Sequence, residues 1–231
     1  MSLVYLIPCH LYDGVTAPIP TYVLEAVKDC QVFFVENERT ARRYLKSLWR
    51  EMVIDDYRWY AIGKAEADVL QAFRNEMKQA TAIGIISEAG CPGVADPGQL
   101  LVAEAQQAGA TVRPLVGPSS ILLALMASGL NGQQFAFHGY LPIDAAERRR
   151  RLQQLDEAVQ KRQQTQLFIE TPYRNDQLLK DILQVCAPGT RLCVAADITA
   201  PSEMIVTKTI KAWQQGPLPA LHKRPVMFLI G

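Results

Sequence analysis

The sequence predicts an α/β protein of two domains, and three observations support that class. Short apolar runs alternate with helix-period segments through the first half of the chain, as in parallel sheets joined by crossover helices. The second half repeats this alternation less regularly, so we expect a mixed sheet there. A predicted strand runs into Gly117-Pro118 just before a new helix, and we therefore divide the chain into residues 1–115 and 116–231.

Five apolar runs are the predicted strands of the first domain, at residues 4–8, 32–36, 52–55, 82–87 and 112–116. Helical spacing of apolar residues predicts three helices, over 40–50, 66–79 and 99–109. The first of these helices is amphipathic and cationic. Gly109 suits the C-terminal cap of the third.

The predicted strands of the second domain are residues 135–139, 166–170, 191–197, 203–209 and 224–231. Asp144 followed by Glu147 resembles a capping box that opens a helix through residue 159. Asn175 is the expected cap of a helix with Leu178 and Ile182 on its apolar face. No repeat and no low-complexity linker interrupts the chain.

Composition and charge exclude several classes of protein. The chain has 231 residues and is 49% apolar, which is ample for packed cores. Its five cysteines include no C-x-x-C pair and its three histidines have no metal-ligand spacing, so neither a disulfide framework nor a metal site is expected. The net charge of +1 argues against indiscriminate nucleic-acid binding. No signal peptide and no membrane-spanning run of about 18 apolar residues is recognisable, so we expect a cytoplasmic protein without a membrane partner.

The densest motif is ISEAGCPGVADPG at residues 86–98, a loop with three glycines and two prolines directly after a strand. Ligands of open parallel sheets bind beyond the carboxyl ends of strands. Glycines there let the backbone approach a ligand, and prolines reduce the entropy lost when the loop is ordered. The loop matches neither common phosphate-binding fingerprint, so we expect a ligand without phosphates. Asp96 is expected to hold the loop by accepting backbone hydrogen bonds.

The segment VGPSS at residues 116–120 is the second candidate binding loop. Ser119 or Ser120 can cap the helix that follows Pro118, and the exposed amides of a helix start favour a carboxylate. Taken alone, the segment is explained equally well as an ordinary helix start.

These two loops, together with G-Y-L-P at residues 139–142, carry a family resemblance. They resemble the S-D-A-G-T-P-x-x-S-D-P-G, P-G-P-S and G-F-L-P motifs of the tetrapyrrole (corrin/porphyrin) methylase superfamily, and more narrowly its ribosomal RNA small subunit methyltransferase I branch. The similarity extends from the first strand to the final PVMFLIG. It implies two α/β domains with S-adenosylmethionine bound in the cleft between them, usually a homodimer. It also implies 2′-O-methylation of 16S ribosomal RNA.

The resemblance further implies which residues bind the cofactor. From the two loops these are Ser87, Ala89, Gly90, Pro92, Gly117, Ser119 and Ser120. The family's late strands add Ala196, Ile198, Thr199, Pro225 and Val226. Adenosylmethionine carries a carboxylate and no phosphate, which agrees with the chemistry expected from the loops themselves.

The sequence departs from the branch at several motifs. Its first loop reads P-C-H-L-Y-D-G where the branch has T-P-I-G-N-L-x-D, and R-E-L-T-K has become A-D-I-T-A at residues 196–200. The A-E-D-T-R motif keeps Glu36 and Arg39, and the Y-E-S-x-x-R motif keeps Glu170 and Arg174. Glu36 and Glu170 both follow apolar strands and are the candidate catalytic bases for a ribose hydroxyl. For each, a turn cap or an ion pair with the neighbouring arginine is an equally good explanation.

The cationic helix supplies the candidate RNA-binding residues Arg39, Arg42, Arg43 and Lys46. Charge reversal at Arg42 and Arg43 is expected to weaken RNA binding and to leave cofactor affinity intact. The run RRRR at 148–151 is better explained as a solvated face than as an RNA contact. His10 and His138 are expected to be satisfied loop histidines. Aromatic side chains that could stack on a base are Tyr12, Phe137, Tyr140 and Tyr173.

Two other functions stay open from the sequence. A methylase of the same family could act on a tetrapyrrole carbon, and an assay of ribosomal subunits against porphyrin precursors separates the two substrates. Alternatively, the altered motifs at residues 35–39 and 196–200 could mark a module that binds the cofactor without catalysis. Cofactor binding without methyl incorporation into ribosomes would distinguish that module.

Overall fold

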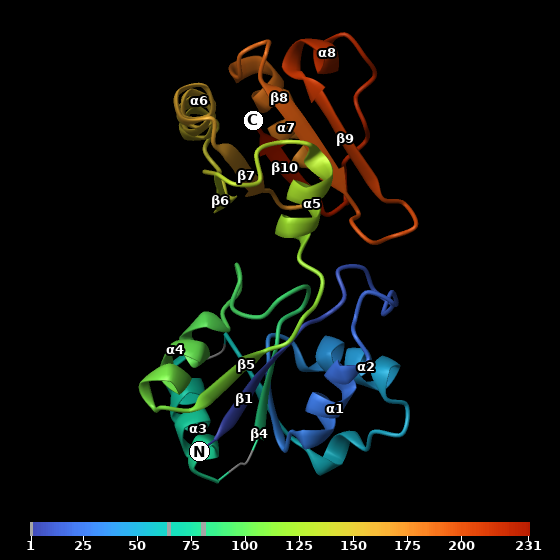
Figure 1. Cartoon of the computed structure of the whole chain (residues 1–231), viewed down its shortest axis with the longest axis vertical. Coiled ribbons are helices and arrows are strands. Elements are labelled where there is room, and N and C mark those ends of the chain that lie inside the picture. The colour runs from blue at the N-terminus through green and yellow to red at the C-terminus, as the bar shows by residue number, and fades with distance from the viewer. Residues whose placement is uncertain (1, 64–65, 80–81) are drawn as a thin grey trace. The chain divides into compact units, whose positions relative to one another are not determined.

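The computed structural model describes residues 2–63, 66–79 and 82–231, and it divides the chain into two compact units, Met1–Ser119 and Ser120–Gly231 (Figure 1). Each unit is built around one five-stranded sheet. The first sheet is entirely parallel and the second is mixed, so the predicted fold class is confirmed. No helix within the described residues is long and apolar enough to cross a membrane.

The first unit alternates strands and helices. Its strands are β1 (Leu3–Ile7), β2 (Val32–Val35), β3 (Arg58–Ala61), β4 (Ala82–Ile86) and β5 (Thr111–Pro114), in the order β3-β2-β4-β1-β5. Its helices are α1 (Tyr22–Asp29), α2 (Glu38–Leu48), α3 (Glu66–Gln79) and α4 (Gln99–Gln107). Helices α1 and α2 cover one face of the sheet, and α3 and α4 cover the other (Figure 1). Because both faces are covered, β2 and β4 are buried along their whole length.

The strand predicted at residues 52–55 is wrong. A short 3-10 turn, η1 (Ile54–Asp56), occupies the second half of that segment, and the strand follows it as β3. Strand β3 lies at the edge of the sheet, and its side chains are exposed or only partly buried. Because β3 is only partly buried, it lacks the run rich in valine, isoleucine and phenylalanine that marks the buried strands β2 and β4.

Helix α1 was also not predicted. Thr21 is of a type that favours a helix start, but the helix spans only eight residues, which gives a short periodic signal. Helix α2 begins at Glu38, two residues before its predicted start, because Asn37 caps it by accepting hydrogen bonds from Arg39 N and Thr40 N. At the end of α4, Gly109 adopts a φ of 69°, as expected for a residue that closes a helix.

The second unit begins with α5 (Ser120–Ser128). Its strands are β6 (Phe135–Tyr140), β7 (Thr165–Ile169), β8 (Arg191–Ala196), β9 (Met204–Thr209) and β10 (Val226–Ile230), in the order β6-β7-β10-β8-β9. The remaining helices are α6 (Ala145–Arg162), α7 (Asn175–Val185) and the short α8 (Ile210–Gln214), which was not predicted. Only β6 and β7 pair in parallel, and the other neighbours are antiparallel.

Of the capping residues predicted for α6 and α7, one is confirmed. Asp144 Oδ1 accepts hydrogen bonds from Ala146 N and Glu147 N, both at 2.9 Å, and so caps α6. The prediction that Asn175 caps α7 is wrong, since Arg174 holds the cap position without a side-chain bond. Asn175 Nδ2 instead donates to Arg224 O at 2.7 Å and ties the start of α7 to the segment before β10.

The run at 148–151 is not a solvated face along its whole length. Arg148 is buried, and its guanidinium donates to Asp181 Oδ2 at 2.8 and 2.6 Å and to Ile143 O at 2.7 Å. The planar fork of arginine satisfies a buried carboxylate, so this pair joins α6 to α7. Farther along the run, Arg151 contacts the ring of His138, whose Nε2 lies 2.7 Å from Gln166 Oε1. The expectation that His138 is satisfied is thus confirmed.

Candidate functional site

Four segments meet at one edge of the first sheet, because the carboxyl ends of parallel strands point the same way. They follow β1, β2, β4 and β5, and we call them together the first rim: residues 8–13, 36–37, 87–98 and 115–119. Cys9 N donates to Gly90 O at 2.8 Å, and Gly90 N donates to Cys9 O at 3.2 Å. This pair of backbone bonds joins the loop after β1 to the predicted cofactor loop after β4.

Two glycines allow the first rim to pack closely. Gly90 has a φ of 73°, in the left-handed region that glycine tolerates best. A Cβ added to Gly117 would lie 2.1 Å from Cβ of Pro8, so only glycine fits there. Next to it, Pro118 O lies 3.5 Å from Cys91 Sγ. The segment after β5 therefore lies directly on the segments after β1 and β4.

The rest of the loop after β4 is held by its own side chains. Asp96 Oδ1 accepts hydrogen bonds from Gly93 N and Gly98 N, each at 2.9 Å, as the sequence predicted. Ser87 is buried, and its hydroxyl donates to Ala89 O at 3.3 Å. The predicted binding residues Ser87, Ala89, Gly90 and Pro92 thus belong to a loop that is closed on itself.

Glu36 lies in the same rim. Its Oε2 accepts a hydrogen bond from Glu88 N at 3.0 Å, so the carboxylate holds the start of the loop after β4. This contact agrees with the explanation of Glu36 as a cap for a turn. Its role as a catalytic base stays a prediction.

A cavity of about 270 Å³ opens in the first rim beside the loop after β4. It is lined by residues from three segments: Cys9, His10, Leu11, Asp13, Thr40, Ala41, Arg43, Ser87 and Glu88. Asp13 lies between an imidazole and a guanidinium, with Oδ1 3.5 Å from His10 Nε2 and Oδ2 2.9 Å from Arg43 Nη2. Sequence reasoning missed this cluster, although His10 occupies the loop where the family's G-N pair is absent.

Helix α2 carries the predicted RNA-binding residues, and most of them have partners within the protein. Arg42 Nη2 lies 2.7 Å from Glu38 Oε2, and its guanidinium lies over the ring of Trp59. Arg43 pairs with Asp13, while Lys46 donates to the carbonyls of Arg50 and Met52 at the end of the helix. Arg39 is exposed, and within the described residues its side chain has no ion-pair partner.

The second unit has a comparable edge. Strand β10 runs antiparallel to β7 and β8, with Met227 opposite Ile169 and Val226 opposite Ala196. The start of β10 therefore meets the ends of the other two strands, and we call the residues there the second rim: 170–174, 197–203 and 222–225. Asp197 N donates to Pro225 O at 3.0 Å and joins two parts of this rim.

An ionic network holds the second rim. Asp197 Oδ2 accepts hydrogen bonds from Arg224 Nε and from Ser202 Oγ, both at 2.8 Å. Arg224 Nη2 also donates to Ser202 O at 2.8 Å. The loop that contains Ile198 and Thr199 is therefore held at both ends.

This loop has an unusual backbone. Asp197 has a φ of 51° and Thr199 a φ of 73°. A β-branched residue in the left-handed region is a true outlier, and such strain costs about 1–3 kcal/mol and concentrates at ligand sites. Thr199 Oγ1 is buried and has no hydrogen-bond partner within the described residues. A buried hydroxyl without a partner is available to hydrogen-bond a polar group of a ligand.

Glu170 lies in the second rim, where its carboxylate is buried in an ion pair. Its side chain is 1% exposed, and Oε1 accepts hydrogen bonds from Arg174 Nη2 and from Thr171 N, both at 2.6 Å. This is the ion pair that the sequence offered as the alternative to catalysis. The catalytic role of Glu170 stays a prediction, and its carboxylate already has two donors.

The candidate base-stacking aromatics have different environments. Tyr12, Tyr140 and Tyr173 are exposed, and Phe137 is partly buried. The ring of Tyr173 lies edge-on to His222 with the ring centres 5.7 Å apart.

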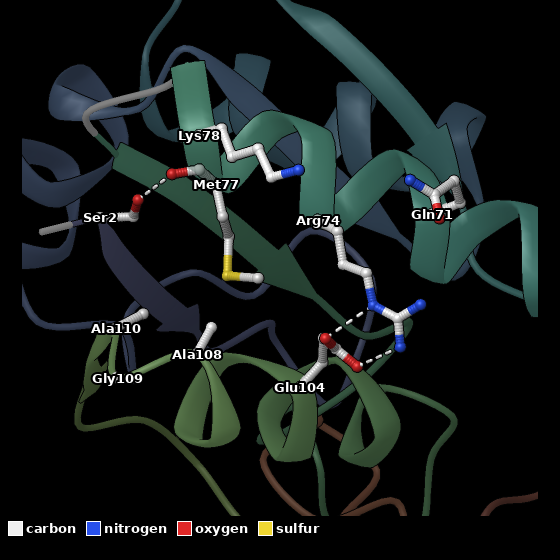
Figure 2. A pocket seen from close by; sticks show the side chains of 9 residues that line it. All are labelled: Ser2, Gln71, Arg74, Met77, Lys78, Glu104, Ala108, Gly109 and Ala110. Atoms are coloured by element: carbon white, nitrogen blue, oxygen red, sulfur yellow. Dashed lines mark hydrogen bonds and ion pairs between the residues drawn. The ribbon is translucent and has the colours of Figure 1, made fainter.

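The larger cavity of the first unit lies elsewhere. It measures about 540 Å³ and opens at the amino ends of the strands, between the C-terminal turns of α3 and α4. Figure 2 shows Arg74 of α3 paired with Glu104 of α4 across this cavity. Arg74 Nε donates to Glu104 Oε1 at 2.7 Å, and Arg74 Nη2 donates to Glu104 Oε2 at 2.8 Å. None of the residues predicted for cofactor, catalysis or RNA lines it.

Solved structures show which class the fold belongs to. A uroporphyrin-III C-methyltransferase from Thermus thermophilus, crystallised with S-adenosyl homocysteine, aligns with a TM-score of 0.57 at 17% identity over 100% of this chain and 97% of that protein. Diphthine synthase aligns with a TM-score of 0.64 at 14% identity over 100% of this chain and 90% of its own. At these identities the likeness concerns the fold alone, and the first of these two proteins is named a methyltransferase.

The chain belongs to the tetrapyrrole (corrin/porphyrin) methylases, whose family model matches residues 16–213. Two curated relatives are both called ribosomal RNA small subunit methyltransferase I. The one from Vibrio cholerae is 28% identical over 88% of this chain and 67% of its own length. The one from Pseudomonas aeruginosa is 35% identical over 65% of this chain and 49% of its own length. The chain thus matches about half to two thirds of these relatives, and the resemblance read from the sequence motifs is confirmed.

Proposed function

We propose that this chain is an S-adenosylmethionine-dependent methyltransferase that methylates a ribose 2′-hydroxyl of 16S ribosomal RNA in the small ribosomal subunit. The family match over residues 16–213 supports methyl transfer, and the names of the relatives support the RNA substrate. The chain matches only part of those relatives, so the substrate is a proposal for this chain.

The single observation that carries the proposal is the first rim. Backbone bonds between Cys9 and Gly90 and the close contact of Gly117 with Pro8 bring the main chain of three segments together at the carboxyl edge of the sheet. Such an edge suits a nucleoside, whose base is recognised by backbone groups and apolar walls.

The residues present fit S-adenosylmethionine. In the second rim the unpartnered Thr199 hydroxyl offers a hydrogen bond, and the buried side chains of Ala196, Ile198 and Val226 offer apolar surface. The loop after β4 lacks the lysine and serine or threonine of a phosphate-binding loop, in keeping with a ligand without phosphates. When bound, the cofactor supplies a methyl group on a sulfonium centre. The chain's own part is to align the acceptor hydroxyl with that methyl, and alignment can supply up to about 7–11 kcal/mol of the barrier reduction.

The test is methyl transfer from radiolabelled S-adenosylmethionine to small ribosomal subunits from a strain that lacks the protein. We expect label in 16S ribosomal RNA and one added methyl on a ribose when the RNA is mapped by mass spectrometry. Label in a porphyrin precursor instead would favour a small-molecule methylase. Cofactor binding by calorimetry without transfer to either substrate would favour the silent binding module.

We also propose that the protein acts in the cytoplasm as a homodimer. Assembled small subunits are found in that compartment, and their methylation would have to take place there. The homodimer follows from the family resemblance, and sedimentation of the purified chain tests it. A single species at twice 25.7 kDa is expected.

A further inference from the structure

The cavity of the first rim brings together chemistry that no family motif supplies. His10 is the residue after Cys9, whose backbone is bonded to Gly90 of the predicted cofactor loop. The His10 side chain is 13% exposed, and its ring packs edge-on against Tyr44 with the ring centres 5.1 Å apart. Tyr44 in turn donates a hydrogen bond to Pro8 O at 2.6 Å. The imidazole is therefore held in place beside the cofactor loop and still reaches the cavity.

Charged groups surround this imidazole. Asp13 lies on its Nε2 side at 3.5 Å, and Arg43 of α2 reaches the other oxygen of the same carboxylate. Glu88 also lines the cavity. On the Nδ1 side, Cys9 Sγ is 3.9 Å away, and burial raises the pKa of that thiol to about 12, so the thiol stays protonated. The partner of Nδ1 is thus only a weak S–H donor.

The two candidate carboxylates have closer hydrogen-bond partners than His10 has. Glu36 accepts a hydrogen bond from the Glu88 amide, and Glu170 is 1% exposed and paired with Arg174. Burial lowers the pKa of His10, so the ring is neutral and can accept a proton near neutral pH. Asp13 opposes that effect and Arg43 reinforces it, so the two neighbours pull the pKa of His10 in opposite directions.

We propose that the 270 Å³ cavity receives the acceptor ribose and that His10 is the base that takes the proton from its hydroxyl, with Asp13 and Arg43 as positioning residues. This inference rests on the proposed function and names a catalytic residue for it. As the oxygen–carbon bond to the methyl forms, the carbon–sulfur bond breaks and its electron pair stays on sulfur, which loses its positive charge. The hydroxyl proton moves to His10 Nδ1, and Asp13 balances the charge of the resulting imidazolium. The proton then leaves to water.

The experiment compares kcat against pH for the full chain and its variants, with small ribosomal subunits and saturating S-adenosylmethionine. The variant His10→Gln is expected to lower kcat by about 10²–10⁴-fold and to abolish the acidic limb of the profile. Its affinity for S-adenosylmethionine, measured by calorimetry, should stay within about twofold of the wild type, because His10 is not a predicted cofactor contact. His138→Gln is the matched control, and its profile should be that of the wild type.

Two further variants keep the proposal testable if His10→Gln unfolds. Asp13→Asn removes the group that raises the pKa of His10, so the acidic limb should move to lower pH. Arg43→Gln removes a group that lowers it, so the limb should move to higher pH. A purely structural role would not move the acidic limb in opposite directions in the two variants.

Unchanged kcat in His10→Gln, or an unmoved limb in both other variants, overturns the role of His10 while leaving the methyltransferase function intact. A wild-type protein that binds the cofactor but transfers no methyl to ribosomal subunits overturns both proposals.

Discussion

Gly117 packs against Pro8 so closely that a methyl group in place of its hydrogen would lie 2.1 Å from Cβ of Pro8. This contact joins the segment after β5 to the segment after β1. The backbone bonds of Cys9 with Gly90 join the segment after β1 to the loop after β4. The first rim thus depends on close contacts of backbone and small side chains from three strands that are distant in the sequence.

Gly117→Ala should disturb this rim. The added methyl forces Pro8 or the segment after β5 to move, and overpacking of this kind costs about 1–3 kcal/mol. We expect a lower urea midpoint and weaker binding of S-adenosylmethionine. Gly132→Ala is the control, because its added Cβ would have nothing within 4 Å and its φ is not in the left-handed region. Equal cofactor affinity in Gly117→Ala and wild type would contradict the prediction.

Arg148→Met should destabilise the second unit, because it leaves Asp181 buried with only weaker contacts from Arg149 and Gln177, each at 3.2 Å. Removing one partner of a buried ion pair costs about 3–5 kcal/mol. In urea unfolding we expect a loss of that order, and Arg148→Met with Asp181→Leu should recover much of it.

The control for this pair is Lys161→Ala, which breaks the exposed pair with Glu157 and should cost about 0–1 kcal/mol. If Arg148→Met leaves the unfolding midpoint unchanged but reduces RNA binding, the run at 148–151 acts on RNA and the structural explanation is wrong.

Arg39→Ala should weaken RNA binding more than changes at its neighbours on α2. Arg42 and Arg43 have carboxylate partners, whereas Arg39 is exposed with no ion-pair partner in the described part of the chain. Losing one phosphate contact reduces the salt dependence of log K by about 0.7–0.9. Binding to an RNA fragment at several salt concentrations measures this slope, with Lys180→Ala on α7 as the control. An unchanged slope, with cofactor affinity also unchanged, would remove Arg39 from the RNA surface.

Glu76 of α3 should contribute to stability in a pH-dependent way. Arg58 donates to its carboxylate at 2.9 and 2.7 Å and Tyr60 donates at 2.8 Å, and these bonds hold the pKa of Glu76 below its ordinary value. A carboxyl with a lowered pKa stabilises the fold above the unfolded value, about 4.3, and this contribution is lost as the pH falls through the folded value.

Glu76→Gln should therefore cost about 1–3 kcal/mol at neutral pH and less in acid, so its stability should fall less steeply than the wild type's below about pH 4.3. Urea unfolding at a series of pH values measures this, with the exposed Glu25→Gln as the control. Parallel curves for Glu76→Gln and wild type would show that the Arg58 contact contributes no pH dependence.

The sequence alone determined the fold class and the family. Helical and strand periodicity placed most of the helices and all but one of the strands, because those elements bury one apolar face or both. The exceptions are β3, α1 and α8. Strand β3 lies at the edge of the sheet and is only partly buried, and the two helices span only eight and five residues, so each gives a weak periodic signal. The glycine-rich loop was recognisable because its residue types follow from local backbone requirements. Gly90 must adopt a backbone that few other residues tolerate, and Asp96 must lie near the amides that it binds.

The tertiary structure alone decided which charged groups have partners. The run RRRR looks uniform in the sequence, yet Arg148 is buried against Asp181, 33 residues away. His10 looked like an ordinary loop histidine until α2 brought Arg43 to Asp13 beside it. Local sequence specifies periodicity and turn chemistry because those depend on near neighbours. The partner of a charge depends on which distant segment the fold places within a few ångströms, and that distance sets both its desolvation and its Coulomb energy.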